Sequence, residues 1–209
     1  MRGRFYQAVR DLHLYLGLFI SPFVLVFAVS VFFLVHAWLP KVSSADPIPR
    51  VVQGQHLPAG LDGLSGRPLV DALKPVLREA GVHGEVGWVQ HLTKEHRLVI
   101  PVMVPGRNTT VTIDVAKREA SIVRRSTGWA EGLVTLHKSP GQHLVGLRMN
   151  WVFMRVWLWL ADATVYLTLF ISVSGVYLWY VLRAERTVGL ILLFAGALTL
   201  SAMVYALSH

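Results

Sequence analysis

Histidine is the residue type whose positions in this sequence point most directly to chemistry. Of 9 histidines, His13 and His36 lie in one long apolar segment, and His137 and His143 shortly precede a second one. Ionisable side chains inside membrane-type apolar segments are costly, so they mark functional sites by default. The chain has no cysteine, which excludes disulfides, thiolate metal sites, iron–sulfur clusters and cysteine nucleophiles. Any metal would therefore be held by imidazole, carboxylate or thioether groups.

The spacing of the histidines predicts two separate sites. His13 and His36 are 23 residues apart, which is roughly 34 Å along a helix at 1.5 Å per residue. We expect His36 to share one end of the helix with His137 and His143, whereas the later apolar segments contain no histidine to partner His13. The structural alternatives are that His36 caps a helix end and that His13 lies at the level of the lipid headgroups.

Asp162 and Arg155 are the other charged candidates in apolar sequence. They are seven residues apart, so on a helix they share one face but lie about 10 Å apart along the axis. Asp162 either orients a ligating histidine through a hydrogen bond or forms a structural pair with Arg155, whose long side chain can reach an interface. We favour the structural pair.

Three apolar segments of the chain are long enough to cross a bilayer, which takes about 20 residues. We expect them to position the candidate residues. We place these spans at residues 12–39, 151–182 and 188–207. The first is longer than the core of a signal peptide, about 7–15 residues, so we expect a retained anchor. Composition agrees, because 54% of the chain is hydrophobic and only 15% is charged, against about 25% charged in soluble domains.

Basic residues set the expected orientation. Arginines occur in the arm at 1–11 and in the turn at 183–187, and short basic flanks stay cytoplasmic. The region between the first two spans and the tail at 208–209 are then periplasmic, in a multi-pass protein of the bacterial inner membrane. With spans present, the net charge of +8 favours membrane lipid and anionic ligands as partners and no nucleic acid.

The region between the first two spans predicts a small α+β domain. A Pro-, Gly- and Ser-rich linker at 40–67 leads to an amphipathic helix from Pro68 to Gly81, which we expect Pro75 to kink or divide. Strands follow, the first with Val86 and Trp88 on one face, at 85–92, 97–104, 109–115 and 120–124. The domain thus covers 68–125, and 126–150 is a connector. The predicted fold is an α-helical membrane protein with three transmembrane helices and an α+β periplasmic domain inserted between the first two.

Three motifs in this order resemble those of the PepSY-associated transmembrane family, also called iron-regulated or PiuB-like membrane proteins. They are Leu12-His13-Leu14-Tyr15-Leu16-Gly17, then Leu136-His137 with Gly141 and Gly146, then Ser174-Gly175-Val176-Tyr177-Leu178-Trp179 with Arg183. The segment 68–125 resembles one PepSY module. Larger members have a fourth helix and often a second PepSY module, so this chain is similar to a compact member.

The resemblance, with the placement of the histidines, implies heme b, electron transfer and the reduction of ferric siderophores or iron. The implied heme-iron ligands are His36 and His137, with His13 and His143 as further cofactor-binding candidates and Asp162 and Arg155 beside them. The expected partners are a ferric chelate, a periplasmic protein or another membrane subunit. The alternative is a non-enzymatic, membrane-anchored PepSY binding module or an accessory subunit of a larger complex. No HExxH, Walker or Ser-His-Asp pattern supports a hydrolase or a nucleotide-dependent enzyme.

Overall fold

The computed structural model describes residues 2–36, 49–54, 56–58, 60–139, 146–147, 149–182 and 185–208. The chain forms two compact units. One consists of Met1–Pro22 with Ala163–His209, and the other is Phe23–Asp162. The predicted ligand His143 lies outside the described residues, and so does part of the predicted linker.

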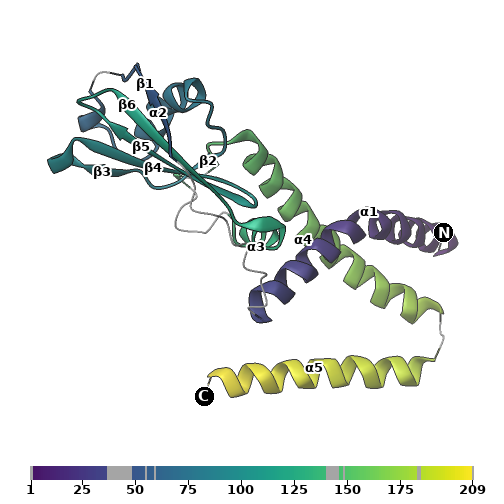
Figure 1. Ribbon diagram of the computed structural model, residues 1–209. Coiled ribbons are helices and arrows are strands. Elements are labelled where there is room, and N and C mark those ends of the chain that lie inside the picture. Colours follow the sequence, from purple (N-terminus) through teal and green to yellow (C-terminus); the bar gives the residue numbers. More distant parts are fainter. Residues whose placement is uncertain are drawn as a thin grey trace. The chain divides into compact units, whose positions relative to one another are not determined.

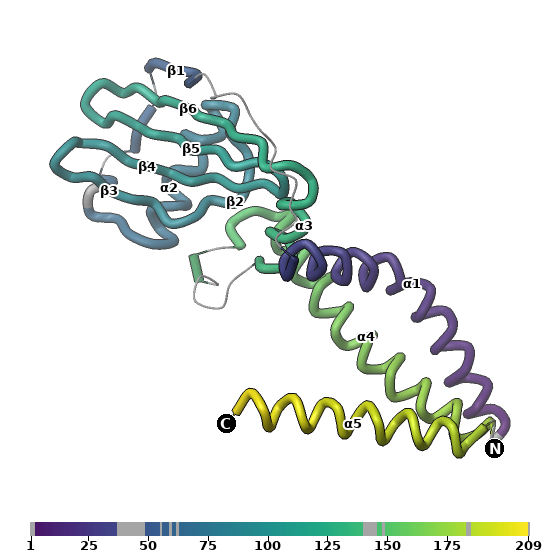
Figure 2. Tube along the Cα trace, turned by 60° about the horizontal axis from the view of Figure 1, so that its bottom comes forward, coloured from purple at the N-terminus to yellow at the C-terminus, as the bar shows by residue number. Residues whose placement is uncertain are grey.

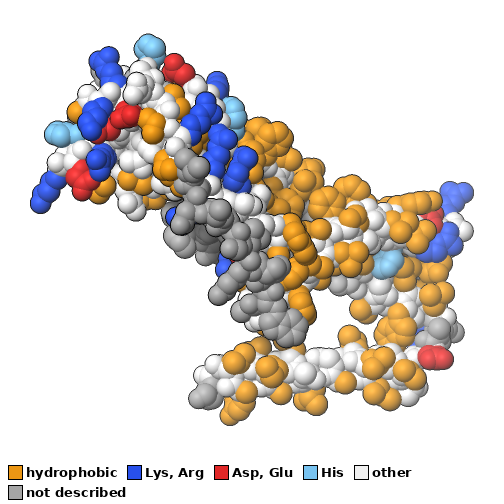
Figure 3. Space-filling view, viewed as in Figure 1, with side chains coloured by type: hydrophobic (Ala, Val, Ile, Leu, Met, Phe, Trp, Pro, Cys, Tyr) orange, Lys and Arg blue, Asp and Glu red, His pale blue; other side chains and the backbone are white. Residues whose placement is uncertain are grey.

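Within the described residues, three helices are long and apolar enough to cross a membrane, which indicates a multi-pass membrane protein. They are α1 (Arg2–His36), α4 (Val152–Leu182) and α5 (Arg186–Ser208), shown in Figure 1. Hydrophobic side chains cover α4 and α5 in Figure 3, whereas Lys and Arg gather over the sheet domain. Helix α1 begins at Arg2, so the predicted arm at 1–11 extends the first span as helix.

The domain between α1 and α4 is built on an antiparallel sheet with strand order β1-β6-β5-β4-β2, and β3 also pairs with β4. Figure 2 shows the sheet with α2 against it. Strands β4, β5 and β6 form a meander of neighbours, as the spacing of their alternating residues predicted. The strands are β1 (Arg50–Gln53), β2 (Glu85–Val86), β3 (Gln90–Leu92), β4 (Arg97–Val104), β5 (Arg107–Asp114) and β6 (Glu119–Ser126).

The core of this domain lies between the sheet and α2 (Gly66–Glu79). Buried residues recur along α2 at helical spacing, and every second residue of β4, β5 and β6 faces them. A fully buried Leu, Ile or Val side chain stabilises the fold by roughly 1.5–3 kcal/mol. Pro75 does not divide α2. The helix is continuous, and Pro75 lies on its exposed face. The core includes Leu69, Val70, Leu73, Val76, Leu77, Leu98, Ile100, Val102, Val111, Ile113, Ala120 and Ile122.

Two elements form where the sequence predicted a linker and a connector. Strand β1 lies inside the range 40–67 and pairs with β6 at the sheet edge. Helix α3 (Gly128–Lys138) lies inside the range 126–150. A four-residue strand is specified by the strand it pairs with more than by its own pattern, so the linker composition concealed it. Two short 3-10 turns, η1 (Leu61–Gly63) and η2 (Thr93–Glu95), complete the domain.

The strand predicted at 85–92 is broken by a β-bulge into β2 and β3. Four steps from Val86 to Gln90 oppose only three on β4, from Val102 to Val99. The Gly87 amide donates to the Pro101 carbonyl at 2.8 Å, but Pro101 has no N–H to return a bond. The ladder therefore shifts by one residue. As a result Val86 is buried while Trp88 is 63% exposed, so the two do not share a face as predicted.

A buried carboxylate joins the sheet to the start of α4. Glu85, 1% exposed, accepts hydrogen bonds from the backbone amides of Asn150 at 3.2 Å and Trp151 at 2.9 Å. The Asn150 side chain in turn accepts from the Val86 amide at 3.1 Å and donates to its carbonyl at 2.7 Å. Asn150 therefore satisfies the edge of β2 as a neighbouring strand would, and it fixes where α4 begins.

We expect Asn150→Ala to lower the free energy of unfolding by about 1–3 kcal/mol, because it leaves the buried amide and carbonyl of Val86 without their hydrogen-bond partners. Denaturant unfolding of the full chain in detergent, followed by circular dichroism, measures the change. Asn108→Ala, at an exposed position of β5, is the matched control and should change stability little. Equal effects of the two substitutions would contradict this role of Asn150.

Candidate functional site

His137 of α3 is held against α1 by a buried serine. Its Nδ1 lies 3.0 Å from the hydroxyl of Ser30, which is 1% exposed. The Ser30 hydroxyl donates its one proton to the Phe27 carbonyl at 2.6 Å, so it must accept from Nδ1–H of the imidazole. This network assigns the Nδ1–H tautomer to His137. Its Nε2 then keeps a lone pair that can bind a metal or a proton.

One aromatic ring contacts the His137 imidazole, and a second ring packs on the first. The ring of Phe27 meets it edge-on with centroids 5.6 Å apart, and Trp157 of α4 packs on Phe27 at 5.7 Å. The Trp157 indole N–H donates to the Leu136 carbonyl at 3.1 Å, which ties α3 to α4. The imidazole is thus fixed in orientation by one hydroxyl and enclosed on part of its surface by apolar rings.

A second imidazole–hydroxyl pair joins α1 and α4 in the other unit. Nδ1 of His13 lies 2.7 Å from the hydroxyl of Ser174, which is 5% exposed. The same hydroxyl lies 3.2 Å from the Ile171 carbonyl. Because the bond to the carbonyl is longer than at Ser30, either tautomer of His13 satisfies this pair.

Two glycines lie where α1 and α4 meet near His13. A Cβ on Gly175 would lie 3.5 Å from Cε1 of His13, and one on Gly17 would lie 3.6 Å from Ile171. Both are ordinary van der Waals distances, so an alanine would fit at either position. The structure therefore brings together His13, Gly17, Ser174 and Gly175, which belong to two motifs quoted separately from the sequence. Small residues and polar bonds of this kind drive helix association in membranes.

His36, the predicted partner of His137, has different neighbours. Its ring stacks on Phe32 with centroids 4.5 Å apart, and its Nδ1–H donates to the Phe32 carbonyl at 3.1 Å. His137 instead contacts Ser30, six residues earlier on α1, or about 9 Å along the helix. Among the residues that the structure describes, no three His, Asp or Glu side chains cluster as a metal site. Ligation of one heme by His36 and His137 stays a prediction.

Arg155 and Asp162 are both exposed on α4. Within the described residues no hydrogen bond or ion pair joins them. Arg155 instead lines a cavity at the start of α4 together with Arg78 and His83. A structural pair between Arg155 and Asp162 is therefore not formed in this structure, and a role of Asp162 in orienting a histidine stays a prediction.

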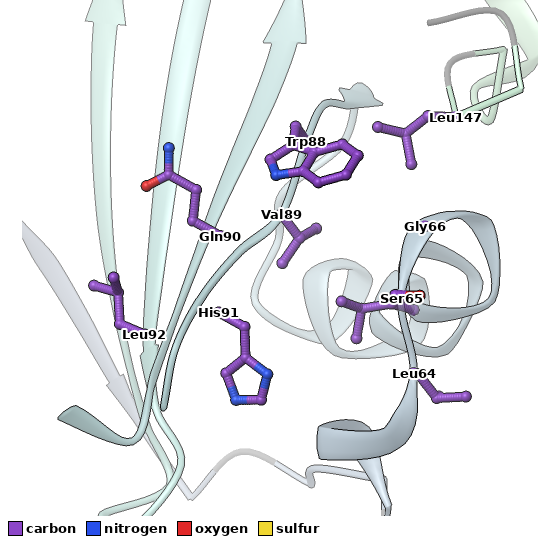
Figure 4. A pocket seen from close by; sticks show the side chains of 10 residues that line it. Leu64, Ser65, Gly66, Trp88, Val89, Gln90, His91, Leu92 and Leu147 are labelled. Atoms are coloured by element: carbon purple, nitrogen blue, oxygen red, sulfur yellow. The ribbon is translucent and has the colours of Figure 1, made fainter. Parts of the chain in front are cut away.

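A larger cavity of about 530 Å³ lies between the N-terminal end of α2 and strand β3. Figure 4 shows Trp88 and Val89 in the segment before β3 and His91 in β3, with Ser65 and Gly66 at the start of α2 opposite. We call it the α2–β3 cavity. Sequence reasoning missed it, because the alternating pattern placed Trp88 with the buried Val86, whereas the bulge at Pro101 turns Trp88 outward.

On α2, the carboxylate of Asp71 forms ion pairs with two basic side chains. Asp71 accepts from Lys74 at 2.8 Å and from Arg67 at 3.1 Å. The hydrogen bond from Lys74, reinforced by the nearby positive charges, holds the pKa of the Asp71 carboxyl below its ordinary value. Asp71 is therefore ionised at neutral pH and engages the Lys74 ammonium.

Sequence reasoning missed Ser30 and Ser174 as site residues. Ser30 is a small polar residue within the apolar segment 12–39, and Ser174 was quoted only as part of a motif. The available signal was an isolated hydroxyl inside a span, since such side chains usually bond across helices or back to their own helix.

Ser30→Ala should release Nδ1 of His137 and change its single tautomer to a mixture of tautomers. Nitrogen-15 spectra of histidine-labelled protein in micelles distinguish the two states. Ser21→Ala is the control, because the Ser21 hydroxyl bonds only the Gly17 carbonyl of its own helix among the described contacts. An unchanged His137 spectrum in folded Ser30→Ala protein would refute the assigned hydrogen bond.

Comparison with known proteins leaves this site to be interpreted from its own geometry. No protein-family model, curated protein or solved structure matches the chain. Membership of the PepSY-associated family therefore stays a prediction from the quoted motifs.

Proposed function

We propose that this protein binds heme b between its membrane helices and transfers electrons to a ferric chelate or to a periplasmic partner protein. One observation carries the proposal: His137 is held at Nδ1 by Ser30, which leaves the Nε2 lone pair available as an axial ligand. Histidines that bind metals almost always donate their other ring N–H to a fixed acceptor in this way.

The surroundings of His137 fit an axial ligand of heme. Heme binding needs one or two axial imidazoles, and the polarity of the pocket tunes the iron. Phe27 supplies an apolar ring beside the imidazole, Trp157 packs on Phe27, and the hydrogen bond to Ser30 orients the imidazole. Bound heme would supply one-electron chemistry, while the chain's own residues hold the imidazole and limit access of water. His36 and His143 are the candidates for the second axial position.

His13 is proposed as the ligand of a second site at the other end of α1. Its contacts with Ser174 and Gly175 fix the ring between two helices. A second axial ligand there would come from another copy of the chain or another subunit. The arginine-rich flanks support a bacterial inner-membrane location with the sheet domain and the C-terminus in the periplasm.

Purified full-length protein should show a Soret band that shifts on reduction, and His137→Ala should remove most of the heme bound at that site. His56→Ala is the matched control, since His56 is exposed and pairs with Glu79 in the sheet domain. His36→Ala tests the proposed second ligand in the same assay, with heme content as the readout. Colourless protein, or equal heme in the His137 and His56 variants, would exclude this function.

A non-enzymatic binding module is the second candidate, and the α2–β3 cavity favours it. The cavity lies beside a bulged strand with Trp88 exposed at 63%. An extended peptide segment of a partner protein could lie along such a strand and insert a side chain beside Trp88. In this case the helices anchor the domain, and replacing His36 or His137 leaves partner binding unchanged.

Selection of random peptides on the full-length protein tests this second candidate. Trp88→Ala should abolish binding of the selected peptides, because Trp88 contributes a large contact area to the cavity. Trp129→Ala, at a similarly exposed tryptophan of α3, should retain it. If no peptide is enriched, or if both variants bind the selected peptides equally, the cavity is not a peptide site.

A further inference from the structure

A basic cavity lies where the sheet domain meets the first turn of α4. Its volume is about 270 Å³, several times the roughly 30 Å³ that one water occupies in the liquid. Figure 1 shows the start of α4 beside β2, and the Glu85–Asn150 bonds hold these elements together. The cavity, called here the α2–α4 cavity, is lined by Lys74, Leu77, Arg78, Val82, His83, Gly84, Val86, Val102, Asn150, Trp151, Val152 and Arg155.

The charges in this cavity are all of one sign. Lys74, Arg78 and Arg155 line it, His83 lies beside them, and no carboxylate is among the lining residues that the structure describes. Lys74 is engaged by Asp71. The side chains of Arg78, His83 and Arg155 make no hydrogen bond or ion pair with any described residue. Like charges gathered in a concave surface raise its positive potential and attract an anion.

The position of the cavity along α4 indicates where the anion comes from. Helix α4 is one of the apolar helices that can span a membrane, and it begins at Val152 in the cavity wall. Trp151 lines the cavity just before this first turn, and tryptophan is enriched at the level of the lipid headgroups. From these two features we place the opening of the cavity at the level of the phospholipid phosphates.

We propose that the α2–α4 cavity binds the phosphate group of an anionic phospholipid headgroup. Guanidinium groups are suited to this ligand, because their planar donors match two phosphate oxygens at once. Arg78 comes from the sheet domain and Arg155 from the membrane helix, so one phosphate bound by both attaches the domain to the lipid surface. This site is independent of heme and of the α2–β3 cavity.

The test uses the full chain in phosphatidylcholine nanodiscs, titrated with phosphatidylglycerol while the melting temperature is followed. A ligand that binds only the folded state raises this temperature as its concentration passes Kd. Arg78→Gln with Arg155→Gln should weaken phosphatidylglycerol binding by at least about tenfold, since two charge-assisted bonds are lost. The control replaces Lys94 and Arg125 by Gln, which removes the same charge at exposed positions outside the cavity, and should bind within about twofold of the parent protein.

Two further arms make the outcome decisive. Asp71→Asn releases Lys74 toward the cavity and should tighten binding, which a loss of folding would not do. Inorganic phosphate is titrated in the same assay without anionic lipid. Stabilisation by phosphate that depends equally on Arg78 and Arg155 would assign the site to a soluble phosphate compound in place of the lipid. No binding of either ligand, or equal weakening by the cavity and control substitutions, would overturn the proposal.

Discussion

The hydrogen bonds of the buried Glu85 carboxylate determine how the sheet domain connects to the membrane helix α4. A buried charged group is unfavourable unless hydrogen bonds compensate for lost hydration, and here backbone amides of Asn150 and Trp151 do so. If the sheet edge and the start of α4 separated, the Glu85 carboxylate and the Val86 peptide groups would lose these hydrogen-bond partners. The same hydrogen bonds hold the start of α4 beside the sheet domain. Trp151 and Arg155 therefore line the same basic cavity as Arg78.

A different contact operates at the apolar helices, because helices in lipid gain little from burying apolar surface. Two imidazole–hydroxyl pairs, His13 with Ser174 and His137 with Ser30, supply polar contacts between otherwise apolar elements. Gly17 and Gly175 lie at the helix contact of the first pair. In each pair the serine stabilises the contact and also orients the imidazole. The residues that hold these elements together are therefore the same ones that position the proposed heme ligands. Packing and the proposed chemistry therefore share the same residues.

The missing amide hydrogen of Pro101 determines the strand geometry beside the α2–β3 cavity. Pro101 accepts a bond from Gly87 but cannot donate one, and the resulting bulge shifts the register of β3 and turns Trp88 to the surface. Without the bulge, Trp88 would alternate with Val86 toward the core. The α2–β3 cavity and its exposed indole are consequences of one backbone position in the adjacent strand.

The membrane spans, the helix at 66–79 and the strand at 97–104 were predictable from sequence, because the length of an apolar run and the period of an amphipathic pattern are local properties. The contacts that build the candidate sites were not. Ser174 lies 161 residues from His13, Ser30 lies 107 from His137, and Asn150 lies 64 from Val86. Strand β1 likewise exists because β6 offers it a partner. Which hydroxyl meets which imidazole, and which amide completes a strand edge, depends on hydrogen-bonding groups that only the folded chain brings within reach.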